Sequence, residues 1–311
     1  MSGPKVVYFS GGVGGAKLAL GLAKVLPPER LTIVANTGDD FEHLGFPVCP
    51  DIDTLVYTLS GLANPQLGWG RRDETSAFMD TIRQLGGPDW FFLGDRDLAM
   101  HAERRRRLGE GESLTAVTAA LSTALGVEHP ILPMTDEPTP TIVETADGPL
   151  PFQDYFVRLR AGPAVTGFTL HGGRKTRPSG AVLDAIAEAD LIVIGPSNPY
   201  ISIDPILKLD GMGLALAQAP APVTVVSPIV GGTAIKGPTA KMMTELGLDS
   251  SVESVARHYG DIADRLVIDT ADGASAEPLR NIVPAVSVTG TVMRTLEDRI
   301  ALARHVLETH G

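Results

Sequence analysis

The stretch VVYFSGGVGGAK at residues 6–17 decides the fold. It opens with an apolar run typical of a buried strand, and a helical pattern follows from Ala16 to about Val25. The glycines between them let the backbone turn tightly and approach an anion, while the N-terminus of the next helix directs N–H groups toward it. This order of strand, glycine-rich loop and helix predicts the first unit of a parallel α/β sheet with a ligand at its end.

The loop differs from two better-known phosphate-binding patterns. Lys17 stands where the dinucleotide fingerprint GxGxxG has its last glycine. Relative to the P-loop, Ala16 replaces the glycine before the lysine, and Leu18 replaces the metal-binding serine or threonine. A tight strand–helix turn without a ligand remains an alternative, although the place of the loop after the first strand favours ligand binding.

Later apolar runs also end in polar or glycine-rich segments. Strands are predicted at 31–35, 191–194, 223–226, 265–268 and 286–288, with a final helix at 293–307. This pattern predicts an α/β fold with a doubly wound, mainly parallel Rossmann-like sheet. The carboxyl ends of its strands should face one crevice, bringing together residues 10–15, 36–40, 195–199 and 227–232.

The middle of the chain has a different pattern. Helices are predicted at 74–85, 96–108 and 113–125, with a short strand or turn at 91–93, and then β-like runs at 131–134, 141–145, 155–159 and 165–170. We therefore predict that residues 1–60 and 176–311 form the nucleotide-binding core. Residues 61–175 form an inserted helical and β subdomain.

Composition excludes several classes of protein. The formal net charge of −11 argues against a nucleic-acid binder, which needs a basic surface to displace counterions. A single cysteine, Cys49, excludes an intramolecular disulfide and suits a reducing, cytoplasmic setting. No segment approaches the roughly 18 consecutive apolar residues of a membrane span, so we expect a soluble protein without a membrane partner.

Four aspartates surround the predicted crevice. Asp39 and Asp40 follow one strand, and Asp51 and Asp53 begin the next helix. Carboxylates of this kind suit Mg²⁺, which commonly takes one or two of them together with substrate phosphates. Asp39, Asp40 and Asp51 are therefore predicted metal ligands. The alternative is that Asp51 and Asp53 only cap the helix.

The segment LGDRDLAMH at residues 93–101 and the arginines at 104–107 carry weaker signals. Asp95 suits a helix cap, while Arg96 would pair with a phosphate or with neighbouring carboxylates. Successive helical residues point about 100° apart, so only one or two of the four arginines can reach a shared site. The seven histidines show no metal-ligand spacing, and no nucleophile elbow is present.

The motifs together resemble the 2-phospho-L-lactate transferase family of coenzyme F-420 biosynthesis, including its bacterial phosphoenolpyruvate-type members. The resemblance covers essentially the whole chain. It rests on SGGVGGAK (10–17), NTGDD (36–40), CPDIDT (49–54), GWGRRDET (68–75), LGDRDLAMH (93–101), ILPMTDEP (131–138), FQDY (152–155), GPSNP (195–199) and SPIVG (227–231).

The resemblance implies a reaction. A guanosine diphosphate donor carries lactate, enolpyruvate or glycerate, and its phospho-acid passes to the terminal ribityl hydroxyl of the deazaflavin Fo, releasing GMP. Mg²⁺ is the implied cofactor. A guanylyltransferase would act upstream and a glutamate ligase downstream, and a homodimer is the family's habit. Which acid is transferred cannot be read from these motifs.

The resemblance also implies site residues. Asp53 matches a position that contacts Fo, where a carboxylate would orient the hydroxyl or accept its proton. Phe92 also falls in the Fo site, where relatives carry polar residues, so stacking on the ring replaces a polar role. The remaining expected residues are Asp51 with Asp53 for catalysis; Gly11, Gly12, Gly14, Lys17, Ser197 and Asn198 for guanosine diphosphate; and Asp95, Arg96 and Asp97 for anion or structural support.

Two other classes compete with this interpretation. Nucleotide-sugar-binding regulators of the same superfamily share the first glycine loop, but they typically continue Asp-Asp with GGSSG. Here Asp40 is followed by FEHLG, and LGDRD is present, which favours the transferase. A nicotinamide oxidoreductase fits the fold but lacks the fingerprint.

Overall fold

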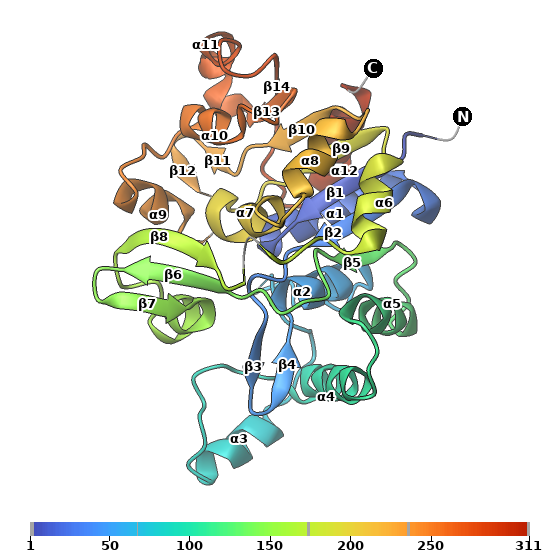
Figure 1. The fold of residues 1–311 in the computed structure, drawn as a ribbon, viewed down its shortest axis with the longest axis vertical. Helices are drawn as coiled ribbons and strands as arrows, with labels where there is room; N and C mark the ends of the chain where they lie inside the picture. The colour runs from blue at the N-terminus through green and yellow to red at the C-terminus, as the bar shows by residue number, and fades with distance from the viewer. Residues whose placement is uncertain (1–2, 67, 173–174, 235–236, 310–311) are drawn as a thin grey trace.

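The computed structural model describes residues 3–66, 68–172, 175–234 and 237–309. A central sheet of seven parallel strands has the order β14-β13-β10-β9-β1-β2-β5, with helices on both faces (Figure 1). The predicted doubly wound α/β fold is confirmed. The sheet strands are β1 (Val6–Ser10), β2 (Leu31–Ala35), β5 (Ile131–Pro133), β9 (Leu191–Ile194), β10 (Val223–Val226), β13 (Arg265–Asp269) and β14 (Ala285–Thr289).

The helices and helical turns connect these strands. They are α1 (Gly12–Val25), η1 (Pro28–Arg30), α2 (Pro50–Leu59), α3 (Ala77–Gln84), α4 (Asp95–Gly109), α5 (Leu114–Ala124), η2 (Asp154–Arg158), α6 (Gly180–Ala187), η4 (Pro199–Ile203), α7 (Asp204–Leu207), α8 (Met212–Gln218), α9 (Thr239–Glu245), α10 (Val252–Tyr259), η5 (Thr270–Ser275), α11 (Ala276–Leu279) and α12 (Leu296–Glu308). The small strands are β3 (Phe41–His43), β4 (Phe46–Val48), β6 (Thr141–Thr145), β7 (Gly148–Pro151), β8 (Val165–Leu170), β11 (Ile229–Val230) and β12 (Thr233–Ala234).

The first strand shows why the sheet is covered on both faces. Successive side chains of a strand point to opposite faces. Val6 and Tyr8 belong to a core that also includes residues of α1, α2 and α12, whereas Val7 and Phe9 belong to a second core with residues of α6, α8 and α10. All of β1 is buried, as its continuous apolar sequence predicts.

The strand order reverses beside β1. Val6 pairs with Leu31 of β2 on one side and with Leu191 of β9 on the other. The chain therefore leaves β1 in one direction and returns to its opposite edge after β5. In open parallel sheets, such a reversal leaves a crevice beyond the carboxyl ends of the two strands, and ligands bind there.

Two excursions from the core build the rest of the molecule. The first, between β2 and β5, contains the β3–β4 hairpin and α2 to α5; the hairpin, α3 and α4 extend away from the sheet (Figure 1). The second contains a three-stranded antiparallel sheet of order β7-β6-β8. Between them, Ile131 of β5 pairs with Ile33 of β2, so 131–133 forms an edge strand of the core rather than part of an inserted subdomain. The remaining domain boundaries stay predictions.

Local structure differs from the sequence-based expectation in two places. Helix α1 begins at Gly12 rather than near Ala16, so the glycines form its first turn. The β-like run at 155–159 lies mostly in the π-helical turn η2. Residues 91–93, predicted as a short strand or turn, lie in the bend and loop before α4. Across the described ranges, every helix is too short or too polar to span a lipid bilayer.

Candidate active site

A cavity of about 700 Å³ lies at the reversal of strand order. Its wall includes Gly12 after β1, Asp39 after β2, Ser197 after β9 and Ser227 after β10. The predicted convergence of these strand ends on one crevice therefore holds in the structure. The rest of the wall comes from α2, from both excursions, which add aromatic side chains, from the start of α9 and from the loop between β14 and α12.

Asn36 organises the polar end of the cavity. Its buried side-chain amide donates to Asp39 Oδ1 and to Asp51 Oδ2, both at 2.9 Å. Its own Oδ1 accepts from the Gly38 N–H at 2.8 Å, which fixes the orientation of the amide. One buried amide thus holds two carboxylates side by side in the cavity wall. In the sequence, Asn36 stands out only as the first residue of the NTGDD motif at 36–40.

The charge of this carboxylate pair is poorly compensated. Burial raises the pKa of Asp39 well above its ordinary value, and the neighbouring Asp51 carboxylate raises it further. Burial likewise raises the pKa of Asp51 to about 6, against the lowering effect of the Asn36 amide and the Gly12 N–H. A divalent cation between the two carboxylates would relieve this cost, and paired carboxylates are suitable ligands for Mg²⁺.

Asp40 is not part of the main cavity wall. It lines a smaller neighbouring cavity together with Asp39, Phe41 and Trp90. Burial raises the pKa of its carboxyl well above the ordinary value, against the lowering effect of the neighbouring Cys49 and Arg104. The structure therefore brings Asp39 and Asp51, but not Asp40, to the main cavity.

The glycine loop is held against the loop after β9. The Ser197 hydroxyl donates to the Gly11 carbonyl at 2.7 Å and accepts from the Gly11 N–H at 3.3 Å. The Gly12 N–H donates to Asp51 Oδ1 at 2.6 Å, so a carboxylate already occupies part of the helix N-terminus. Ser197 therefore joins the loop after β1 to the loop after β9, and it has this structural role with or without a ligand contact.

Gly14 has a packing reason to be glycine. An added Cβ would overlap the carbonyl oxygen of Pro196. We expect Gly14→Ala to lower the free energy of unfolding by about 1–3 kcal/mol, as overpacking typically does. Urea unfolding checks this, with Gly213→Ala in α8 as the control, because a Cβ there meets open space. Equal stabilities for the two variants would contradict the packing explanation.

Lys17 and Asn198 also lie in the cavity wall. Lys17 Nζ donates to the carbonyl of Met293 at 3.0 Å, which connects α1 to the loop before α12. Asn198 Oδ1 accepts from the N–H groups of Tyr200 and Ile201 and so caps the turn η4. Its side-chain nitrogen lies 3.4 Å from the sulfur of Met242.

Asp53 lines the cavity from α2 and is ion-paired to Arg104 of α4. Burial raises the pKa of Asp53, while the Arg104 guanidinium and then His101 lower it. His101 Nε2 lies 3.4 Å from Asp97 Oδ2, and the Tyr57 hydroxyl donates to Asp97 Oδ1 at 2.5 Å. Sequence reasoning missed the parts played by Arg104, His101 and Tyr57. The spacing of His101 and Arg104 on α4 was visible in the sequence, but not the direction in which α4 faces α2, which carries Tyr57.

Asp95, Arg96 and Asp97 take separate places. Asp95 accepts from the N–H groups of Ala77 and Phe78 and so caps α3 rather than α4. Arg96 is exposed, and its backbone N–H donates to Glu74. Only Asp97 of the three lines the cavity.

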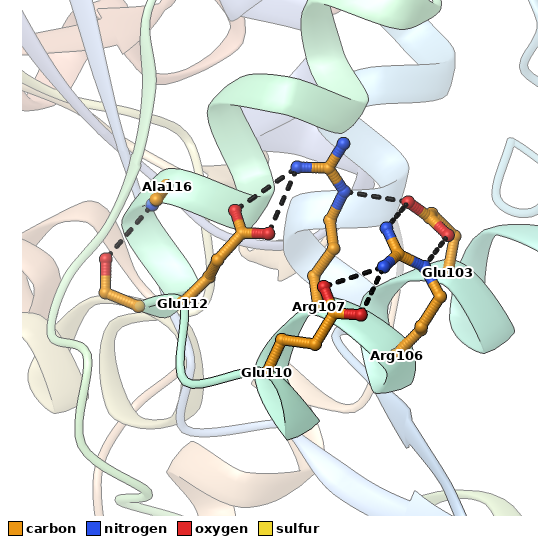
Figure 2. Close-up of polar contacts among 7 residues, drawn as sticks. Glu103, Arg106, Arg107, Glu110, Glu112 and Ala116 are labelled. Carbon is orange, nitrogen blue, oxygen red and sulfur yellow. Dashed lines mark hydrogen bonds and ion pairs between the residues drawn. The ribbon is translucent and has the colours of Figure 1, made fainter.

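The remaining arginines of the run at 104–107 lie on the protein surface. Arg106 pairs with Glu103 and Glu110, and Arg107 pairs with Glu103 and Glu112 (Figure 2). Arg105 pairs with Glu42 of β3. We expect at most one or two of the four arginines to reach a shared site, and Arg104 is the one that reaches Asp53.

Exposed aromatic side chains form another part of the cavity wall. Trp69, Phe92 and Phe156 line the cavity and remain 49%, 45% and 38% exposed. They come from the loop after α2, the loop before α4 and the turn η2. Phe156 stacks on Phe152, with ring centroids 5.3 Å apart. Phe92 therefore stands in the cavity wall rather than in a core.

The strand order defines a Rossmann-like α/β protein, and its cavity lies at the carboxyl ends of the strands, where proteins of this class bind ligands. The family model of 2-phospho-L-lactate transferase CofD matches residues 6–286. A phosphoenolpyruvate transferase of Streptomyces griseus is 40% identical over 311 residues, covering 98% of both chains. A 2-phospho-L-lactate transferase of Methanothermobacter thermautotrophicus is 37% identical, covering 97% of both chains. The chain belongs to the 2-phospho-L-lactate transferase family.

A solved structure from Bacillus halodurans has the same fold. It matches with a TM-score of 0.66 at 18% identity, covering 99% of this chain and 100% of that chain. At this identity the likeness concerns the fold alone.

Proposed function

We propose that this protein transfers a phospho-acid from a guanosine diphosphate carrier to the ribityl hydroxyl of Fo, a step in coenzyme F-420 biosynthesis. Membership of a transferase family supports transfer chemistry over a sensor or an oxidoreductase. Reaction in the cytoplasm by a homodimer is part of the same proposal.

One observation carries the proposal: a single cavity joins a polar end to an aromatic wall. The polar end combines the N-terminus of α1 with Asp39 and Asp51, which suits a diphosphate bound with a cation. The aromatic wall of Trp69, Phe92 and Phe156 suits a flat ring system. A nucleotide diphosphate donor and a deazaflavin acceptor have these two chemistries.

In the proposed reaction, the acceptor hydroxyl oxygen forms a bond to the phosphorus that bears the acid, and the bond from that phosphorus to GMP breaks. The N–H groups of the first turn of α1 hold the diphosphate. Asp53 orients the hydroxyl and receives its proton. Such transfer needs positioning and charge neutralisation more than covalent catalysis. Mg²⁺, held by Asp39 and Asp51, would supply charge neutralisation on the diphosphate.

Mass spectrometry tests the function directly. The purified protein is incubated with Fo, GTP, Mg²⁺, a guanylyltransferase and three competing acids: 2-phospholactate, phosphoenolpyruvate and 3-phosphoglycerate. We expect an Fo phosphodiester together with GMP, and the product mass identifies the acid. If each activated donor is made but no Fo adduct appears, the proposed function is wrong.

Phe92→Ala tests the aromatic wall. Because Phe92 is 45% exposed, its loss should weaken Fo binding, with an aromatic contribution of about 0.5–1.5 kcal/mol beyond area burial, and should leave thermal unfolding nearly unchanged. Fluorescence titration with Fo and a melting curve measure both. Phe168→Ala is the matched control, because Phe168 is not part of the cavity wall, packs against the larger apolar core and stacks on Tyr200. It should lower the melting temperature more than Phe92→Ala does. Unchanged Fo affinity in Phe92→Ala would remove Phe92 from the acceptor site.

A further inference from the structure

Arg104 is the one charged side chain among the largest fully buried residues of the described chain, with 1% exposure. It lies on α4, which packs against β4. One terminal nitrogen, Nη2, contacts Asp53 Oδ1, and the other, Nη1, lies 3.4 Å from Asp53 Oδ2. A guanidinium that reaches both oxygens of a carboxylate fixes the plane of that carboxylate as well as its charge.

Other contacts fix the guanidinium itself. Nη1 donates to the carbonyl of Pro47 at 3.1 Å and lies 3.0 Å from His101 Nδ1. Arginine has only donors, so Nδ1 of His101 must accept this bond. The ring proton of neutral His101 then sits on Nε2, which faces Asp97. Arg104 is therefore held by the backbone of Pro47 in β4 and by the His101 ring, in addition to its contact with Asp53.

The positions of these groups separate their roles. Asp53, Asp97 and His101 line the cavity, whereas Arg104 is buried and is not part of the cavity wall. Asp53, Asp97 and His101 also lie close enough together to hold a cation. The guanidinium already supplies a positive charge on Asp53, which disfavours a second cation there.

We propose that Arg104 is a positioning residue: its two-point ion pair holds the Asp53 carboxylate in the orientation that meets the acceptor hydroxyl. This inference rests on the proposed function. It assigns a role to one of the four consecutive arginines, because only Arg104 is buried and paired with Asp53.

Arg104→Lys is the first test. Lysine keeps the charge but offers a single ammonium point in place of the fork. We expect kcat to fall about 10- to 100-fold, the scale of a misplaced reacting group, with KM for donor and acceptor little changed. Arg106→Lys is the matched control on the same helix, because its ion pairs with Glu103 and Glu110 (Figure 2) are exposed and do not involve Asp53.

A double-mutant cycle shows whether Arg104 acts through Asp53. Arg104→Lys should lower kcat in the wild-type background and have no further effect in an Asp53→Asn background. Millimolar guanidinium should restore part of the turnover of Arg104→Ala, whereas sodium chloride at the same concentration should not. The turnover of Arg106→Ala should not respond to guanidinium. A merely structural role predicts equal losses in both backgrounds and no rescue, and either result overturns the proposal.

A crystal structure of Arg104→Lys tests the orientation independently of any reaction. We expect the Asp53 carboxylate to rotate from its wild-type position while α2 and α4 stay in place. An unmoved carboxylate contradicts the positioning role even if the Fo reaction proceeds. If the wild-type protein forms no Fo adduct but the carboxylate does rotate, the proposed function fails and the structural role of Arg104 stands.

Discussion

Asp53→Asn is expected to lower turnover by about 10²–10⁴-fold, the usual effect of losing a group that orients or accepts the reacting proton. Asparagine preserves the size of the side chain, so the cavity keeps its shape. It cannot accept the proton of the acceptor hydroxyl, and it offers the Arg104 guanidinium a neutral partner. Initial rates with saturating donor and Fo, normalised to folded protein, measure the effect.

The same substitution should also lower stability. Breaking a buried ion pair by removing one partner typically costs about 3–5 kcal/mol, because the other charge stays buried. Assays therefore belong well below the melting temperature of the variant, with the folded fraction followed by circular dichroism. Asp95→Asn is the matched control: its carboxylate caps α3 outside the cavity, so it should lose stability without a comparable loss of turnover. If folded Asp53→Asn turns over normally, Asp53 has only a structural role.

Removal of Mg²⁺ is expected to abolish product formation. A metal that neutralises charge stabilises the transition state by several kcal/mol. Each loss of about 1.4 kcal/mol lowers the rate tenfold. Product measured after treatment with excess chelator, and again after Mg²⁺ is restored, checks the requirement. Full turnover in excess chelator would show that no metal is needed.

Two aspartate variants locate the metal. Asp51→Asn should raise the Mg²⁺ concentration needed for half-maximal rate, because Asp51 shares the Asn36 amide with Asp39 at the cavity wall. Asp40→Asn should leave that concentration unchanged, because Asp40, unlike Asp39 and Asp51, is not part of the main cavity wall. The reverse pattern would return Asp40 to the metal site and remove Asp51 from it.

The sequence was informative where local pattern and topology agree. Val6–Ser10 and Leu191–Ile194 were predictable as strands because their apolar runs are continuous and end in glycine or polar residues. Their convergence on one crevice followed from the rule for parallel sheets. The strand at Ile131–Pro133 was predictable, but its pairing with β2 was not, because the paired residues Ile33 and Ile131 are 98 positions apart and no local signal records their contact.

Other differences have local causes. Tyr155–Leu159 reads as a strand from its aromatic and β-branched residues, yet tertiary packing buries Tyr155 within a π-helical turn. The four arginines at 104–107 share one residue type, so their sequence gives no reason to separate Arg104 from its neighbours. Only the packing of α4 against β4 turns Arg104 inward toward Asp53.

One part of the cavity wall is built from strand ends, and another part from the two excursions. These two parts differ in how freely they can change during evolution. Loops at the ends of strands are constrained by the register of the sheet, as the Ser197 bonds to Gly11 show. The loops that carry Trp69 and Phe92 lie in the excursion between β2 and β5, where length and side chains can drift without shifting any strand pair. Under the proposed function, members of the family could therefore change the acceptor at the aromatic wall while the polar end of the cavity stays fixed. Exchanging residues 61–94 between relatives should alter acceptor preference and leave the donor preference unchanged.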